Sequence, residues 1–218
     1  MATARRIRVQ AGGTWRVAAC LWALAAGAAH ADDLLARLEA ARTPELERSL
    51  TNLAREAIAL QLREGRVLAT PRALPDLWRR PAGVFVSLGR KGHDRGCRGT
   101  LHPTQASLAA EIIHSAVAAA TEDDRFAPVT ADELPDLEYL VSVVGDLQPI
   151  HGPRDLTPGV HGLALSGPRG TGVLLPGEAR TASWEWRECC RRAGVSPSQR
   201  PRAVRFRTVL FRSHGIRR

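Results

Sequence analysis

The sequence predicts an α+β protein in which helices are interspersed irregularly with hairpins of β-strands. Several stretches repeat apolar residues at steps of three and four, as amphipathic helices do. Two pairs of β-like runs are each joined by a short turn that contains glycine. Because hairpins pair their strands antiparallel, a purely parallel sheet is excluded and the α+β class follows.

The first long helix is expected to begin after Thr43, a favourable N-cap residue that is followed by Pro44 at the first helical position. Its apolar face recurs through Leu46, Leu50, Leu53, Ala57 and Leu60. The next segment, 66–81, holds three prolines and is predicted to be a connecting loop.

The runs 83–88 and 95–101 predict the first hairpin. If its second strand is regular, Arg95 and Cys97 lie on one face and Arg98 on the other. Glycine weakens a strand interior, so Gly96 and Gly99 indicate a bulge or a close approach to the backbone.

The remaining elements follow from the same patterns. They are a helix capped by Ser107, a strand at 138–144, a second hairpin at 159–176, a helix capped by Ser183 and ended by Gly194, and a closing strand at 203–211.

The first 31 residues have the features of a cleaved export signal. A basic stretch precedes a short apolar run, and small residues at 29 and 31 suit a signal peptidase. The apolar run is shorter than the roughly 20 residues that span a bilayer, so no stable membrane span is expected. Cleavage after Ala31 predicts a periplasmic or extracellular protein that begins at Asp32.

Charge and cysteine content narrow the function classes. Four of the 31 basic residues precede residue 32, which leaves 27 basic against 22 acidic residues, without a basic run. This scattered arginine content argues against nucleic-acid binding. The mature chain has three cysteines, Cys97, Cys189 and Cys190, so at least one thiol stays free or pairs between molecules, and a bridge from Cys97 to one of the others stays open.

From about Leu50 to Phe211 the chain resembles the AMMECR family, whose bacterial members are called AmmeMemoRadiSam system protein A. The resemblance is carried by a series of short stretches in the family's order: LAREAI, GVFVSL, RGCRGTL, the alanine-rich helix, DDRFAPVTADEL, LVSVV, PGVHGL, LLP and CRRAGV. It divides the chain into a signal (1–31), an N-terminal helical extension (32–49), an AMMECR-like domain (50–213) and a basic tail (214–218).

This resemblance implies two unequal lobes, the larger a split β-α-β type of mostly antiparallel sheet flanked by helices, with a cleft between the lobes. The family's Arg-Gly-Cys-x-Gly stretch places Arg95, Gly96, Cys97 and Gly99 at that cleft, and Arg125 and Phe126 match the family's Arg-Phe pair. Memo-like and radical S-adenosylmethionine proteins are partners by family analogy only. No cofactor is implied.

Three kinds of site are open at Cys97. As a catalytic nucleophile, its thiolate would be stabilised by Arg95, with His93, His102 or His161 as the base. As a metal ligand it would need the same histidines, but no zinc-type spacing is present and no metal is assigned. As part of a binding cleft, it would lie beside Arg95, Arg125 and the glycine amides, which suit a small anionic molecule. An ion pair from Arg125 to Asp123 or Asp124 is the structural alternative.

These sites lead to three functional hypotheses. The first is an exported accessory or small anionic ligand-binding protein with its cleft around Arg95–Cys97. The alternative is a cysteine-dependent enzyme that uses Cys97. A purely structural partner protein is the third.

Overall fold

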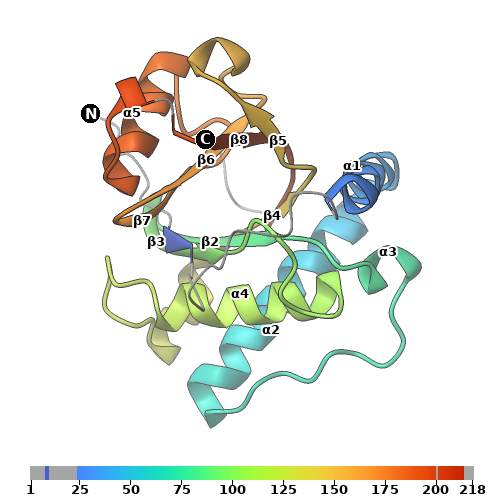
Figure 1. Ribbon diagram of the computed structural model, residues 1–218. Helices are drawn as coiled ribbons and strands as arrows, with labels where there is room; N and C mark the ends of the chain where they lie inside the picture. The colour runs from blue at the N-terminus through green and yellow to red at the C-terminus, as the bar shows by residue number, and fades with distance from the viewer. Residues whose placement is uncertain (1–7, 10–23, 200, 214–218) are drawn as a thin grey trace. The chain divides into compact units, whose positions relative to one another are not determined.

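The computed structural model describes residues 8–9, 24–199 and 201–213 (Figure 1). The chain forms two compact units of unequal size. The larger unit holds Leu34–Val144 and the strand residues from Val209 onward, and the smaller holds Gly145–Thr208 and the start of the first helix up to Asp33. The predicted α+β class with two unequal lobes is confirmed.

The larger unit is built on an antiparallel sheet. Within this unit the strand order is β3-β2-β4-β9, and β2 pairs antiparallel with both β3 and β4. The bounds are β2 (Val84–Arg90), β3 (His93–Gly99), β4 (Leu137–Val144) and β9 (Thr208–Arg212). Because β3 and β4 are joined through a helix while β2 lies between them, this is the expected split β-α-β arrangement. A further two-residue strand, β1 (Arg8–Val9), precedes the first helix.

Helices α2 (Pro44–Glu64) and α4 (Leu108–Thr121) cover one face of this sheet (Figure 1). The other helices of this part of the chain are α1 (Leu24–Ala40) and α3 (Asp76–Arg79). Thr43 and Ser107 cap α2 and α4 as predicted, each accepting a backbone N–H at 3.2 Å. The core between the layers joins apolar residues of α1, α2 and α4 to Val84, Val86 and Leu88 of β2.

Residues 32–49, predicted to be an N-terminal extension, contribute to this same core through Leu34, Leu35 and Leu38 of α1. Helix α1 also runs through the predicted cleavage point after Ala31. Most of the predicted signal and the basic tail 214–218 lie outside the described residues, and the signal stays a prediction. None of the described helices is long and apolar enough to cross a membrane.

The smaller unit has a four-stranded sheet in the order β5-β8-β6-β7, with helix α5 packed against β6 and β7. The bounds are β5 (Gln148–Ile150), β6 (Gly162–Gly167), β7 (Gly170–Leu174), α5 (Ala182–Ala193) and β8 (Ala203–Phe206). Short 3₁₀ turns occur at η1 (Ala131–Asp136) in the larger unit and at η2 (Pro153–Asp155) and η3 (Pro197–Gln199) in the smaller. The core of this unit contains Leu163, Leu174, Trp186 and Cys189.

Three predicted elements differ in detail. The closing strand at 203–211 is two strands, β8 and β9, which belong to different sheets. The interruption at Arg207 shifts the two-residue period, so Ala203 and Phe206 are buried in β8 and Val209 and Phe211 in β9. Thr181, two residues before Ser183, caps α5. The proline-containing segment 66–81 includes the short helix α3.

Candidate functional site

Strand β3 contains a β-bulge at the conspicuous Arg-Gly-Cys stretch. The register pairs Leu88 with Gly96 but Gly89 with Asp94, so Arg95 is an extra residue without a partner on β2. The bulge breaks the two-residue period between Arg95 and Cys97, so the regular strand on which their predicted shared face depended is not present.

Cys97 lies on β3 in the larger unit, paired with Ser87 of β2. The residue is 3% exposed, and its thiol lies 3.0 Å from the Ser87 hydroxyl. Its backbone N–H donates to a carboxylate oxygen of Asp123 at 2.8 Å. Cys97 is thus fixed both through its side chain and through its backbone.

Asp123, which follows the end of α4, joins Cys97 to Arg125. Its carboxylate accepts hydrogen bonds from Nε of Arg125 at 2.9 Å and from Nη2 at 2.5 Å. Burial by itself would raise the pKa of Asp123, but the bonds from Arg125 and from the Cys97 amide outweigh burial and lower it. Asp123 therefore stays ionised at neutral pH and does not serve as a proton acceptor there.

Arg125 is the predicted cation that contacts this site. Burial by itself would lower the pKa of Arg125. The contacts with Asp123 outweigh this effect, and Cys97 and Asp94 contribute less in the same direction, so the pKa of Arg125 is raised. Its guanidinium carbon lies 5.1 Å from the ring centre of Phe126, in cation–π contact. Its ion pair with Asp123 is the structural alternative that the sequence left open.

Arg95 contacts a different part of the structure. Its Nε and Nη2 donate to the two carboxylate oxygens of Glu133 in η1, each at 2.8 Å. Its Nη1 and Nη2 also donate to the carbonyls of Ala127 and Pro128, at 2.8 and 3.2 Å. Arg95 therefore holds the loop before η1 against β3 and is nearly saturated with hydrogen bonds.

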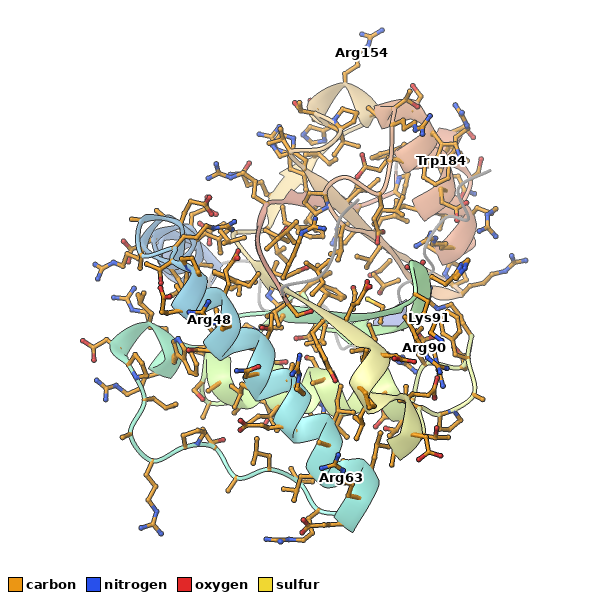
Figure 2. The ribbon with its side chains drawn as sticks, turned by 180° about the vertical axis from the view of Figure 1, so that it is seen from behind. Arg48, Arg63, Arg90, Lys91, Arg154 and Trp184 are labelled. Atoms are coloured by element: carbon orange, nitrogen blue, oxygen red, sulfur yellow. The ribbon has the colours of Figure 1, made fainter. Side chains whose placement is uncertain are left out.

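Glu133 is the acceptor that organises this loop. It also accepts from Arg90 at 3.0 Å and from the backbone N–H of Thr130 at 2.9 Å. These partners, Arg95 first, lower its pKa to about 2. Figure 2 shows Arg90 and Lys91 at the turn between β2 and β3, where both contact Asp136 at the end of η1.

The two glycines of the stretch are required by packing. A Cβ atom on Gly96 would lie 2.2 Å from the carbonyl oxygen of Ala119, so helix α4 approaches the strand too closely for any side chain. A Cβ on Gly99 would lie 2.1 Å from the carbonyl oxygen of Val84. Within the described residues, the close approach that the glycines predicted comes from the protein's own backbone.

Arg98, the remaining arginine of the stretch, contacts the helix that follows. Its guanidinium donates to the carbonyl oxygen of Glu122, the C-cap residue of α4, through Nε at 3.1 Å and also through Nη2. A cation there interacts favourably with the negative end of the helix dipole.

The three histidines considered as partners of Cys97 differ in their surroundings. His93 and His102 are exposed, and Nδ1 of His161, in the smaller unit, accepts from the backbone N–H of Thr157 at 3.0 Å. None of the described cysteines, Cys97, Cys189 and Cys190, forms a disulfide. No group of three or more His, Cys, Asp or Glu side chains with metal-binding geometry occurs among the described residues.

The structure thus brings Cys97, Arg125 and Phe126 into one cluster and places Arg95 on the neighbouring loop contact. The sequence did not identify Ser87 or Glu133 as parts of these contacts. A serine in an otherwise apolar strand is the signal that could have indicated Ser87, since a buried hydroxyl needs a partner. The cluster can orient an anionic group beside a thiol.

Comparison with known proteins gives a consistent result. The AMMECR1 family profile matches residues 51–214. A protein of Methanothermobacter thermautotrophicus is 36% identical over 182 residues, which cover 77% of this chain and 94% of the relative. A protein of Thermotoga maritima is 39% identical over 117 residues, which cover 53% of this chain and 67% of the relative.

A solved structure shows the same fold. The crystal structure of the uncharacterized protein PH0010 from Pyrococcus horikoshii matches with a TM-score of 0.72 and 28% sequence identity. The match covers 79% of this chain and 93% of that chain.

Proposed function

The chain belongs to the AMMECR1 family, and from this premise we propose that it is an accessory protein that binds a small anionic molecule at Arg125, beside Cys97. The bound group is a carboxylate or a phosphate, because both match the planar donor arrangement of a guanidinium.

A single observation carries this proposal. Arg125 uses Nε and Nη2 for Asp123, while its Nη1 has no hydrogen-bond acceptor among the described residues. Its side chain keeps 19% of its surface exposed. A guanidinium with one edge fixed by a carboxylate and the other edge open is oriented in advance to receive a second anion. Arg95 supports the site indirectly, as a positioning residue for the loop that follows Phe126.

The proposal is tested by binding measurements on the full chain with inorganic phosphate, nucleoside phosphates and small carboxylic acids. We expect at least one of these anions to bind, and Arg125→Gln to weaken that binding by about 10-fold to 100-fold, the range for a charge-assisted hydrogen bond. Arg48→Gln, on an exposed arginine of α2, is the matched control and leaves affinity unchanged. Failure of every anion to bind, or full affinity in Arg125→Gln, would overturn the proposal.

The cysteine-dependent enzyme remains the second candidate because of one feature: the charge of Arg125 acts on Cys97. A nearby cation stabilises a thiolate. This candidate predicts that Cys97 reacts with iodoacetamide in the folded protein faster than Cys189 and Cys190, and that Cys97→Ser abolishes any turnover that is found. If Cys97 reacts with iodoacetamide no faster than Cys189 and Cys190, the cysteine-dependent enzyme is rejected.

We place this activity outside the cytoplasm, on the basis of the predicted signal. Partnership with Memo-like and radical S-adenosylmethionine proteins rests on family analogy. Mass spectrometry of the intact protein recovered from cell fractions tests the location. A chain that starts at Asp32 in the exported fraction supports it, and a cytoplasmic chain that retains Met1–Ala31 rejects it.

A further inference from the structure

The start of helix α5 contains a buried carboxyl group that the proposed anion site does not use. The side chain of Glu185 belongs to a residue only 1% exposed, and neither of its oxygens has a hydrogen-bond partner in the part of the chain that the structure describes. An ionised carboxylate in such a position is costly, so the neutral, protonated form is favoured.

Among the described residues, the strands and turns packed against α5 contain no buried cation. Arg169, in the turn between β6 and β7, and Arg180, in the loop between β7 and α5, are both exposed. Strands β6 and β7 and the turn η3 contain no titratable residue. Turn η2 contributes Arg154 and Asp155, both exposed, and Arg154 points away from the protein in Figure 2.

On α5 itself, two of the arginines bind Glu188 and the third is exposed to solvent. Glu188 accepts from Arg191 at 2.6 Å and from Arg192 at 2.9 Å, while Arg187 is exposed. Cys189, one turn beyond Glu185, is fully buried, and burial raises the pKa of its thiol well above the ordinary value. The thiol is therefore neutral and supplies no compensating charge.

The remaining neighbour is a second acid. Glu178, in the loop between β7 and α5, accepts the backbone N–H of Leu175 at 3.1 Å. Burial, with a smaller contribution from the charge of Glu178, raises the pKa of Glu185 to about 7. Ionisation of Glu185 therefore places two negative charges at the same junction.

We propose that residues 175–185, the β7–α5 junction, form a pH-sensitive contact that is closed while Glu185 carries its proton and loosens when Glu185 ionises beside Glu178. The physical basis is the geometry: a fully buried, unpartnered carboxyl at the first turns of a helix, next to a loop that contains a second carboxylate. In the protonated state no repulsion acts across the junction. In the ionised state hydration of Glu185 requires the loop or the first turn of α5 to move away.

The direction of the pH effect follows from the raised pKa. The contact is fully formed below 4.5, the ordinary pKa of a glutamate, and is lost as the pH rises through about 7. The device belongs to the smaller unit, so its test does not depend on whether an anion binds at Arg125.

Carbon-13 NMR of the full chain labelled at its glutamate carboxyls tests the proposal directly. We expect one carboxyl resonance, absent from Glu185→Gln, to titrate near 7. Hydrogen exchange of the junction amides, corrected for the intrinsic pH dependence, is expected to accelerate over the same range. In Glu185→Gln this acceleration disappears, whereas the control Glu188→Gln, on the same helix, retains it.

A second variant keeps the test decisive if Glu185→Gln does not fold. Glu178→Gln removes the like charge, so the Glu185 titration moves to lower pH and the loosening follows it. Titration of Glu185 near 4.5 in the wild-type chain, or junction amides whose corrected exchange does not change across the titration, would overturn the proposal.

Discussion

Cys97 is held by groups that are distant from it in the sequence. Its thiol contacts Ser87 on the neighbouring strand, and its amide is bound by Asp123 after helix α4. Sequence reasoning placed Cys97 in a strand of a hairpin and named Asp123 as a possible partner of Arg125. It could not show that one carboxylate serves both residues, because that depends on where α4 ends relative to β3.

The contact between Ser87 and Cys97 is expected to stabilise the larger unit by about 1 kcal/mol, the typical net value of a buried hydrogen bond. Urea unfolding of Ser87→Ala, Cys97→Ala and the double variant measures this as a coupling energy. The pair Ser87→Ala and Cys189→Ala, whose residues belong to different units, is the control and should show additive effects. Additivity in the Ser87–Cys97 cycle would contradict the prediction.

Gly96 is expected to tolerate no side chain. Because a Cβ would meet the Ala119 carbonyl at 2.2 Å, Gly96→Ala should destabilise the larger unit by about 3 kcal/mol through overpacking. Gly92→Ala in the same hairpin is the comparison: its φ of 78° is unfavourable, but no atom lies within 4 Å of the added Cβ. A cost of about 1 kcal/mol is expected there. If urea unfolding shows equal destabilisation by the two substitutions, helix α4 moves away to accommodate the methyl group at position 96, and the prediction is wrong.

At the scale of elements, the two arginines predicted for the site, Arg95 and Arg125, contact different parts of the structure. Arg95 leaves the register and binds Glu133 in η1, whereas Arg125 reaches the Cys97 cluster from the loop after α4. The two in-strand glycines did indicate an irregular strand. They could not indicate the position of the extra residue, because a bulge is placed by the pairing of both strands.

The Glu133 contacts predict how acid affects the loop before η1. Since the pKa of Glu133 is lowered from 4.5 to about 2, its stabilising contribution is complete above 4.5 and is lost as the pH falls toward 2. Glu133→Gln should cost about 2 kcal/mol at neutral pH, from weakened charge-assisted hydrogen bonds to Arg95 and Arg90. In this variant the free energy of unfolding should also fall less steeply as the pH decreases from 4.5 toward 2.

Glu64→Gln is the control for this comparison, because its pair with Arg66 is largely exposed. A cost below about 0.5 kcal/mol is expected there. Denaturant unfolding at a series of pH values checks both variants. If the free energy of unfolding of Glu133→Gln falls with acid as steeply as that of the wild-type chain, other carboxylates govern acid unfolding.

At the scale of the whole molecule, the C-terminal half of helix α1 is part of the hydrophobic core. Leu34, Leu35 and Leu38 are at most 5% exposed, and all three follow the predicted cleavage point. A chain that begins at Asp32 should therefore keep the fold. A chain that begins at Arg42 loses these three leucines, at about 2 to 5 kcal/mol each, and should not fold stably. Circular dichroism and thermal unfolding of the two truncated chains distinguish these outcomes.

The sequence by itself determined the α+β class, the helix caps at Thr43 and Ser107, both hairpins and the family, because these depend on local residue preferences and on short-range periodicity. Tertiary structure decided the break at Arg207, the bulge at Arg95 and the burial of Glu185. Each of these depends on which distant segments pair or pack, and neither periodicity nor composition contains that information. The same reason explains why sequence identified Cys97 and Arg125 separately, while only the fold joined them through Asp123.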